Sequence, residues 1–552
     1  MLPTDPFDTK EASQDQRLGV IVGGSLTEGL IIRLDPQIAV EDMAVGRFIT
    51  MHGAGKRFIG IVADVSLADD PSLSQVAPEA NHPFISKVLS ATYGYSVIKV
   101  KPYLVIGGTA QAILDGPQPA KTIPGLFTAA AEASQSDVEK IFGKDDDKHL
   151  WIGSPLDMEC NLNLNIEEAV RRSNGIFGKS GTGKTFLARI LLAGIVQKGR
   201  AVNLVFDMHS EYGWGGKKED GTQVKGLKAL FSSKVAVFTL DPDRSRSRAG
   251  GGGTDYDVTI SYDDIEPEDV SLLKNTLSLS DPAADCAYTL ANRFGSKWFS
   301  KFMELDTADF ETYAKSINVN EQALRTLHRR LQQLTRLKFL RPDTRNDSVN
   351  AILSNLNGGR HVVLEFGGYG DDLRAYILVA NLLTRRIHER YKEQVEAAMG
   401  ERSKEPPPLV ITIEEAHKYL TPGIAGQTIF GTIAREMRKY NVTLLIVDQR
   451  PSGIDDEVMS QLGTKFTCQL DNEKDVDAVL SGASGRSELR SVLSRLESKQ
   501  QALVFGHAVP MPVVVRVRDY GTADSYKSFG WKEQAEAMQQ SKSEVDKLWG
   551  KS

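Results

Sequence analysis

The sequence predicts an α/β protein: a mostly parallel sheet interrupted by an all-α insertion and preceded by a small N-terminal β-barrel. Three observations support this. The N-terminal part shows short alternating apolar runs separated by glycine, strand-like runs alternate with helical ones after about Leu150, and a complete phosphate loop stands between a strand and a helix. The length of 552 residues suggests roughly three to four domains.

The composition is that of an ordinary globular protein, with 41% hydrophobic and 25% charged residues. Lys+Arg 66 against Asp+Glu 72 gives a net charge of -6, so any contact with nucleic acid would come from a local basic strip. Cys160, Cys286 and Cys468 lie far apart, which predicts neither disulfides nor a zinc site. No signal sequence and no apolar run of about 18 residues is found, so we expect a cytoplasmic protein that does not enter a membrane.

Four domains or segments are expected in order along the chain. Residues 1–116 predict the barrel, from runs such as Leu18–Val22 and Gly29–Leu34. Residues 117–149, with several prolines and an acidic run, predict a connector. Residues 150–520 predict the main domain, with a helical insertion at about 264–345. We expect its strands near 201–206, 235–239, 361–366, 409–413, 443–447, 466–470 and 502–506.

Residues 521–552 predict a C-terminal helical arm, because Trp531, Met538 and Val545 recur every seven residues. Such a helix either braces an adjacent subunit or folds back on its own core.

The phosphate loop reads Gly178-Lys179-Ser180-Gly181-Thr182-Gly183-Lys184-Thr185. Its glycines let successive backbone N–H groups face phosphate oxygens, Lys184 is expected to reach the β- and γ-phosphates, and Thr185 to place its hydroxyl on Mg²⁺. A strand at 173–177 and the apolar face of a following helix make a chance glycine-rich turn the weaker interpretation. The loop therefore predicts binding of ATP with Mg²⁺.

Hydrolysis also needs carboxylates, and the strand Leu409–Ile413 leads directly into Glu414 and Glu415. At the carboxyl end of a buried strand, Glu414 is expected to hold Mg²⁺ and Glu415 to orient the attacking water. The alternative is two solvated glutamates at a helix start.

Further polar residues follow neighbouring strands. Gln449 is a candidate sensor of the γ-phosphate, since its amide can bond both to water and to phosphate. Asp207 and Glu211 follow an earlier strand, where they either tune Mg²⁺ and the water or serve as ordinary turn residues.

Three arginines are candidates for stabilising charge on the γ-phosphate. Arg435 and Arg438 stand three residues apart on the expected helix 427–439, where either could reach a neighbouring subunit, and Arg172 could act within its own chain. Exposed arginines are common, so a solvated surface position is an equal alternative.

Together these segments resemble the HerA family, within the FtsK-HerA group of ring-shaped DNA-pumping ATPases. The resemblance runs through nearly the whole chain. It rests on Arg171–Gly178, Asp207–Tyr212, Glu414–His417, Ala434–Lys439 and Gln449–Ser452. The chain departs from the usual pattern at Met208, Ser210 and Asp448.

The resemblance implies a RecA-like P-loop ATPase domain behind the barrel, assembled as a homohexamer with double-stranded DNA in its central channel. It further implies a NurA-type nuclease or another effector as partner, docked on the barrel, in DNA end processing or antiphage defence. Candidate DNA-contacting residues are Lys217 and Lys218, after a glycine-rich turn, and Arg244, Arg246 and Arg248, in a basic loop expected to be flexible.

Two other functions stay open. The chain could be a nucleotide-dependent assembly module that holds a partner effector in a ring, with DNA movement secondary. A secretion or conjugation ATPase is disfavoured by the missing membrane segment.

Overall fold

The computed structural model describes residues 17–67, 96–109, 111, 116–156, 158–217, 221–248, 254–343, 347–401, 404–423, 425–436 and 439–531. They fall into two compact units. The first comprises Met1–Ala169, Phe177–Lys184 and Gly463–Arg518, and the second comprises Val170–Ile176, Thr185–Leu462 and Asp519–Ser552.

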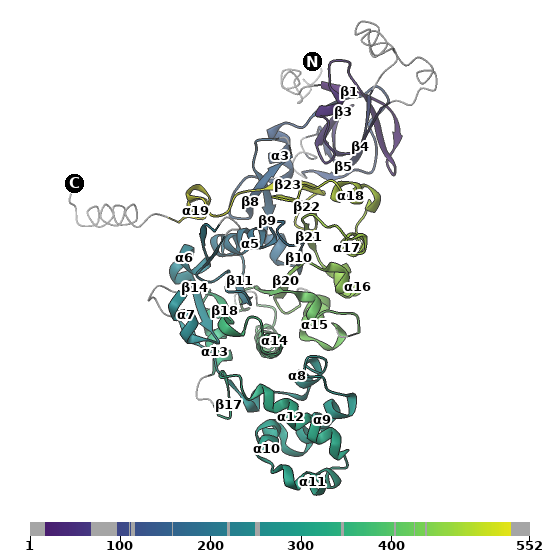
Figure 1. The fold of residues 1–552 in the computed structure, drawn as a ribbon. Coiled ribbons are helices and arrows are strands. Elements are labelled where there is room, and N and C mark those ends of the chain that lie inside the picture. The colour runs from purple at the N-terminus through teal and green to yellow at the C-terminus, as the bar shows by residue number, and fades with distance from the viewer. Residues whose placement is uncertain are drawn as a thin grey trace, which may run out of the picture. The chain divides into compact units, whose positions relative to one another are not determined.

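The N-terminal part of the first unit is a closed β-barrel (Figure 1). Its strands follow the order β2-β1-β7-β3-β4-β5, and β5 pairs back onto β2 from Val100 opposite Leu30 to Val97 opposite Arg33. The strands are β1 Arg17–Ser25, β2 Gly29–Leu34, β3 Phe48–Gly53, β4 Lys56–Leu67, β5 Ser96–Gly107 and β7 Ala129–Glu132, with the short β6 Gln118–Pro119 added to β5. This confirms the predicted barrel.

Alternating apolar side chains fill the barrel interior, as expected for strands with one buried face. Along β5, Ile98, Val100, Leu104 and Ile106 are buried and alternate with more exposed neighbours. Ile98 and Val100 join a core with residues of the other strands, including Leu18, Ile32, Met51 and Val62.

One barrel strand lies in the segment that the sequence suggested was a connector. β7 pairs antiparallel with both β1 and β3. Its Ala-Ala-Ala-Glu sequence has no β-branched or aromatic residue, so pairing with its neighbours rather than local propensity makes it a strand. The helix α3 Gln135–Phe142 follows, capped by Ser134. The other domain boundaries stay predictions.

The rest of the first unit holds an antiparallel set of strands in the order β21-β22-β23-β8-β9. They are β21 Thr464–Thr467, β22 Gln501–Gly506, β23 Val513–Val517, β8 His149–Pro155 and β9 Leu162–Asn165, accompanied by α17 Glu473–Val479 and α18 Arg486–Leu493. The strand expected at 466–470 is β21, which ends at Thr467. Beyond it, Cys468 N–H donates to Phe177 O and Gln469 O accepts from Lys179 N–H, so this stretch bonds to the start of the phosphate loop.

The second unit is organised by a mainly parallel sheet in the order β15-β14-β18-β11-β19-β20-β10. Its strands are β15 Tyr256–Asp257, β14 Val235–Thr239, β18 His361–Glu365, β11 Val202–Asp207, β19 Leu409–Glu414, β20 Val442–Asp448 and β10 Asn174–Phe177. Every residue of β14, β18, β11, β19 and β20 is buried, as a sheet covered on both faces requires.

Helices cover this sheet and follow its strands in the chain. In the second unit they are α5 Lys184–Lys198, α6 Leu227–Phe231, α7 Pro242–Arg248, α13 Ser348–Asn357, α14 Leu373–Ala397, α15 Ile429–Glu436, α16 Asp456–Gln461 and α19 Ala523–Ser528, with a hairpin of β12 Gly215–Lys217 and β13 Gln223–Lys225. The short helix α4 Ile166–Val170 follows β9 and belongs mostly to the first unit. The α/β fold class is therefore confirmed.

The predicted insertion is helical. It contains α8 Pro267–Leu272, α9 Asp281–Phe294, α10 Trp298–Glu304, α11 Phe310–Ser316 and α12 Glu321–Leu334. Two short strands, β16 Ile260–Ser261 and β17 Leu340–Arg341, pair in parallel where the chain enters and leaves it. Its core is aromatic, with Phe302, Phe310 and His328 in mutual ring contact.

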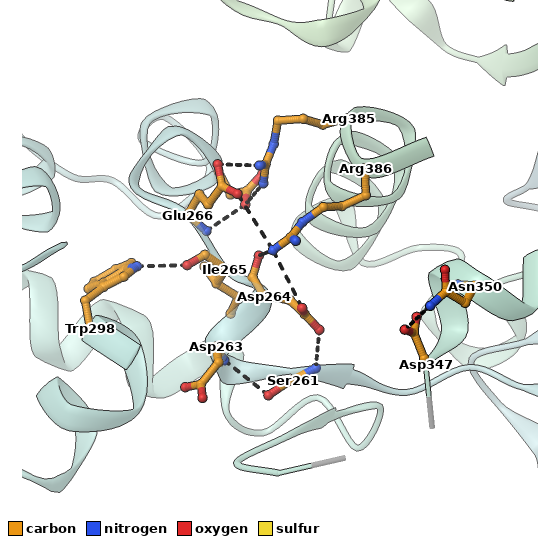
Figure 2. A network of polar contacts seen from close by, with 11 residues as sticks. Ser261, Asp263, Asp264, Ile265, Glu266, Trp298, Asp347, Asn350, Arg385 and Arg386 are labelled. Carbon is orange, nitrogen blue, oxygen red and sulfur yellow. Dashed lines mark hydrogen bonds and ion pairs between the residues drawn. The ribbon is translucent and has the colours of Figure 1, made fainter. Parts of the chain in front are cut away.

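A polar network joins the start of the insertion to α14 (Figure 2). Arg385 pairs with Glu266 and, at 2.9 Å, with the fully buried Asp269, whose other oxygen accepts from Asn381. Burial raises the pKa of Asp269, and the Arg385 guanidinium opposes that rise. Figure 2 also shows Arg386 reaching Asp264 and Glu266.

Two predicted segments differ in the structure. The basic stretch expected to be a flexible loop is helical from Pro242 to Arg248. Pro242 starts the helix, and the side chain of Ser245, on the inner face of the helix, is buried. The helix expected at 427–439 is α15, Ile429–Glu436. Residues 532–552, which hold most of the predicted arm, lie outside the described part. No helix among the described residues is long and apolar enough to cross a membrane.

Candidate functional site

The phosphate loop follows β10 and curls as its glycines predict. A Cβ on Gly178 would lie 2.7 Å from Cys468 Cβ and 2.8 Å from Thr182 Oγ1, so only glycine fits there. Gly183 has a φ of +96°, which disfavours any side chain. Thr185 follows in the first turn of α5, so the loop opens onto a helix N-terminus.

Two lysines fix the loop within the first unit. The ammonium of Lys184 donates to Lys179 O at 2.7 Å, which places it inside the curl. Thr182 Oγ1 donates to the same carbonyl at 2.8 Å. The Lys179 side chain points elsewhere, to Asp471 at 3.0 Å. Of the two, only Lys184 is thus placed as the phosphate-binding lysine of the motif.

At the carboxyl edge of the sheet in the second unit, four neighbouring parallel strands each end in an acidic residue. They are Asp207 in β11, Glu365 in β18, Glu414 in β19 and Asp448 in β20, and all four are buried. Glu365 accepts from Ser245 at 2.9 Å. The sequence identified two of these residues as site candidates and overlooked Glu365 and Asp448.

Asp207 orders the loop that follows it. Its carboxylate accepts backbone N–H bonds from Glu211 at 2.7 Å, Tyr212 at 2.8 Å and Gly213 at 3.0 Å. Burial raises its pKa, and these three bonds oppose the rise. Its predicted contact with Mg²⁺ stays a prediction, since both oxygens already serve the loop. Within this loop Ser210 has a φ of +54°, a left-handed conformation that is uncommon for a residue with a side chain.

Glu414 is buried between polar side chains. Its Oε1 accepts from Tyr212 OH at 2.8 Å, while its Oε2 is buried without a hydrogen-bond partner among the described residues. Tyr376 OH bonds to its backbone. Burial, reinforced by the charge of Asp207, raises the pKa of Glu414 to about 8. Such a carboxyl is largely protonated at neutral pH until a cation approaches it.

Glu415 turns away from the strand. It adopts a left-handed conformation with φ 51° and ψ 43°, which is strained for a residue with a side chain. Its N–H still donates to Val447 O at 3.0 Å, and its Oε1 accepts from Gln449 at 3.1 Å. The structure thus brings together the predicted water-orienting residue and the predicted sensor.

His417 and Asp448 complete this group, although no role was assigned to either from the sequence. His417 Nδ1 lies 3.1 Å from both carboxylate oxygens of Asp448, and His417 Nε2 lies 3.6 Å from Glu415 Oε2. The hydrogen bond that His417 donates to Asp448 raises the pKa of His417. The only sequence signal is the spacing Glu-Glu-Ala-His at the end of a strand.

Of the candidate arginines, Arg435 is the one whose side-chain contacts the structure describes. Arg435 lies on α15 and contacts Gly426 O at 3.5 Å and Glu457 at 3.9 Å, so it is engaged within its own chain. Arg172 is partly buried just before β10. Arg438 lies outside the described residues. Their catalytic roles stay predictions.

Of the candidate DNA-contacting residues, Arg244 and Arg246 are exposed on α7, and Arg246 pairs with Asp257 at 3.5 Å. Arg248 ends that helix and Lys217 ends β12, but their side chains lie outside the described part, as does Lys218. The described positions of Arg244 and Arg246 do not by themselves form a continuous basic surface for DNA.

Among the described residues no group of three or more His, Cys, Asp or Glu side chains forms a ready metal site. The orphaned oxygen of Glu414 nevertheless fits a Mg²⁺ shell made mostly of water and phosphate, which needs one or two protein oxygens.

The chain is similar in sequence to a family model and to curated helicases. Residues 150–387 match the family model described as "Helicase HerA, central domain". The DNA double-strand break repair helicase HerA of Pyrococcus furiosus is 23% identical over 418 residues, covering 70% of this chain and 72% of that protein. The protein of the same description from Sulfurisphaera tokodaii is 23% identical over 507 residues, covering 91% and 92%.

Among solved structures, similar chains include VirB4 of Thermoanaerobacter pseudethanolicus, at 13% identity and a TM-score of 0.44, covering 68% of this chain and 98% of that one. The plasmid coupling protein TrwB in complex with ADP and Mg²⁺ is 13% identical with a TM-score of 0.46, covering 72% and 94%.

Proposed function

Since residues 150–387 carry the central domain of the HerA helicase family and make the chain a P-loop ATPase, we propose that it uses ATP hydrolysis to move along or unwind double-stranded DNA. The observation that carries this proposal is the acidic edge of the parallel sheet, where Glu415 and Gln449 meet 3.1 Å apart. A phosphate loop alone binds nucleotide, whereas a carboxylate paired with an amide can orient a hydrolytic water.

In this proposal the backbone N–H groups of Gly178–Thr185 and the ammonium of Lys184 bind the phosphates of ATP. The Lys184 ammonium exchanges the carbonyl of Lys179 for phosphate oxygens when nucleotide enters. The backbone conformation of Gly178 and Gly183 supports this role, since glycines with positive φ allow the tight loop in which backbone N–H groups bind phosphate.

Glu414 and the hydroxyl of Thr185 are the residues that would hold Mg²⁺. The bound ion would neutralise charge that develops on the phosphates. The unpartnered Oε2 of Glu414 supports the assignment, because the ion would satisfy that buried oxygen and favour the ionised carboxylate. Asp207 then acts indirectly, by ordering the loop whose Tyr212 bonds to Glu414.

Glu415 accepts a hydrogen bond from the attacking water, and Gln449 moves its amide from Glu415 towards the γ-phosphate. The left-handed backbone at Glu415 supports this role, since strained residues of this kind gather where side-chain direction matters. Arg435, Arg438 or Arg172 would stabilise the transition-state charge, the first two from a neighbouring subunit.

We propose further that six copies form a ring around DNA and that a nuclease or other effector docks on the barrel. The segment before β7 supports the docking, because Leu126 and Phe127 are 65% and 76% exposed and Phe127 has a φ of +63°. A large apolar side chain presented on strained backbone suits a partner surface. The assignment of the role to end processing or antiphage defence depends on that partner.

The second function, a nucleotide-dependent module that only assembles a partner, predicts a different response to DNA. Purified chain is assayed for ATP hydrolysis with Mg²⁺, with and without linear duplex, beside Lys184→Ala and Glu415→Gln. The translocase proposal expects DNA to raise the rate of the wild type several-fold, and both variants to stay inactive. Equal rates with and without DNA would favour the assembly module.

A further inference from the structure

Glu415 is held at both of its carboxylate oxygens. Gln449 Nε2 donates to Oε1 at 3.1 Å, and His417 Nε2 lies 3.6 Å from Oε2. The Glu415 side chain is 23% exposed, so most of its surface contacts protein, and these contacts determine its orientation. Of the two contacts, the one from Gln449 is lost if its amide turns towards a γ-phosphate, which leaves His417 as the remaining constraint.

His417 is itself anchored by the last residue of the neighbouring strand. Asp448 has a fully buried side chain and accepts from His417 N–H at 2.7 Å, besides contacting Nδ1 at 3.1 Å. Asp448 also accepts from Arg450 N–H at 2.7 Å, which fixes the carboxylate in turn. The imidazole therefore lies between the fixed carboxylate of Asp448 and the carboxylate of Glu415.

This arrangement dictates where the protons of His417 lie. The contact with Asp448 favours a hydrogen on Nδ1, so a neutral ring would turn the lone pair of Nε2 towards the oxygen of Glu415. A protonated ring instead presents N–H to both carboxylates. The contact with Glu415 is attractive only when His417 is a cation.

From this geometry we infer that His417, anchored by Asp448, is a positioning residue that holds Glu415 in its water-orienting position during ATP hydrolysis. The inference rests on the proposed roles of Glu415 and Gln449. It assigns His417 no contact with the nucleotide. Substituting His417 should therefore change the rate of the chemical step and leave nucleotide binding, which depends on the phosphate loop, unchanged.

The charges around His417 agree with a cationic ring. The hydrogen bond to Asp448 from β20 and the charges of Asp448 and Glu415 raise its pKa, whereas burial and the charge of Lys418, one residue along the chain, lower it, and the net shift is upward. The turn Pro451–Gly453 packs on its Cβ and brings no titratable side chain. The carboxylates of Asp448 and Glu415 therefore favour the cationic form of His417, and the charge of the Lys418 ammonium disfavours it.

The test uses two substitutions that each keep one half of the imidazole. His417→Asn retains a donor near the Nδ1 position, facing Asp448, but loses the contact with Glu415. His417→Gln places a donor near the Nε2 position. We expect His417→Asn to lower kcat about 10- to 100-fold with the KM for ATP changed less than about twofold, and His417→Gln to retain more of the rate. His507→Gln, which alters a histidine paired with Glu168 in the first unit, is the matched control.

The pH profile separates positioning from a structural effect. In the wild type the rate should fall as pH rises through the pKa of His417, and this fall should vanish in His417→Asn. Asp448→Asn should move the fall to lower pH, because Asp448 is the main cause of the raised pKa. A His417→Asn enzyme with wild-type kcat and an unchanged profile would overturn the inference. If that variant fails to fold, the profile of Asp448→Asn decides. A wild type without ATPase activity would overturn the proposed function instead.

Discussion

Glu414 is a buried carboxyl whose ionisation should weaken the fold, and Glu414→Gln removes that ionisation. The pKa of Glu414 rises from an ordinary 4.5 to about 8, mainly through burial. A raised carboxyl pKa means that the folded state binds the proton more tightly than the unfolded state does. Its contribution to stability is therefore full below about pH 4.5 and is lost as pH rises towards 8.

The size of the loss follows from the shift. Each pKa unit corresponds to about 1.4 kcal/mol, so ionising Glu414 in the folded protein costs on the order of 3 to 5 kcal/mol by about pH 8. Glutamine has nearly the shape of a protonated glutamate and keeps an acceptor for Tyr212 OH. Glu414→Gln should match the wild type near pH 5 and exceed its stability at about pH 8 by a few kcal/mol.

The assay is urea-induced unfolding of both proteins, compared at each pH from about 5 to 9 without Mg²⁺ and nucleotide. Tyr212→Phe is the matched variant. It removes a hydrogen bond that lowers the pKa of Glu414, so the loss of stability should continue to higher pH than in the wild type. Parallel stability curves for wild type and Glu414→Gln would refute the reasoning. Added Mg²⁺ with ATP should reduce the difference between the two, since the ion would compensate the buried charge.

Three further predictions concern other parts of the chain. Arg385→Met should destabilise the start of the helical insertion by about 3 to 5 kcal/mol, because the fully buried Asp269 would lose its ion pair with the guanidinium of Arg385. Hydrogen exchange of residues 264–345 measures this loss, and unchanged exchange would contradict a stabilising role for the network in Figure 2. Burial raises the pKa of the Cys468 thiol to about 11, so this thiol should resist alkylation at about pH 8 until the protein unfolds. Rapid labelling of Cys468 in the folded chain, detected by mass spectrometry, would contradict its close packing against the phosphate loop. Phe127→Ser should leave ATP hydrolysis unchanged but weaken binding of a co-purified effector about tenfold or more, whereas equal binding would remove Phe127 from the docking surface.

Much of the fold follows from sequence pattern alone. The parallel strands are continuous apolar runs bounded by turn residues, so their positions were predictable to within a few residues. β7 was not, because its Ala-rich sequence becomes a strand only between β1 and β3. The helix α7 was hidden by its Arg-Ser repeat, since burial of Ser245 against Glu365 is a tertiary effect.

The candidate site was predictable where residues adjoin a motif. Lys184, Glu414, Glu415 and Gln449 follow from the phosphate loop and from strand ends. The link from Asp448 through His417 to Glu415 was not predictable, because it depends on the left-handed turn at Glu415 and on the register of β19 with β20. The orphaned oxygen of Glu414 likewise depends on which side chains surround it.

The central claim is ATP-driven movement along double-stranded DNA. Displacement of a fluorescent third strand from a long duplex tests it most directly, because only a motor that travels along the duplex removes the third strand. We expect displacement that requires ATP and Mg²⁺, is delayed in proportion to the distance from the free DNA end, and is absent in Glu415→Gln. A chain that hydrolyses ATP on this duplex yet leaves the third strand in place would contradict it.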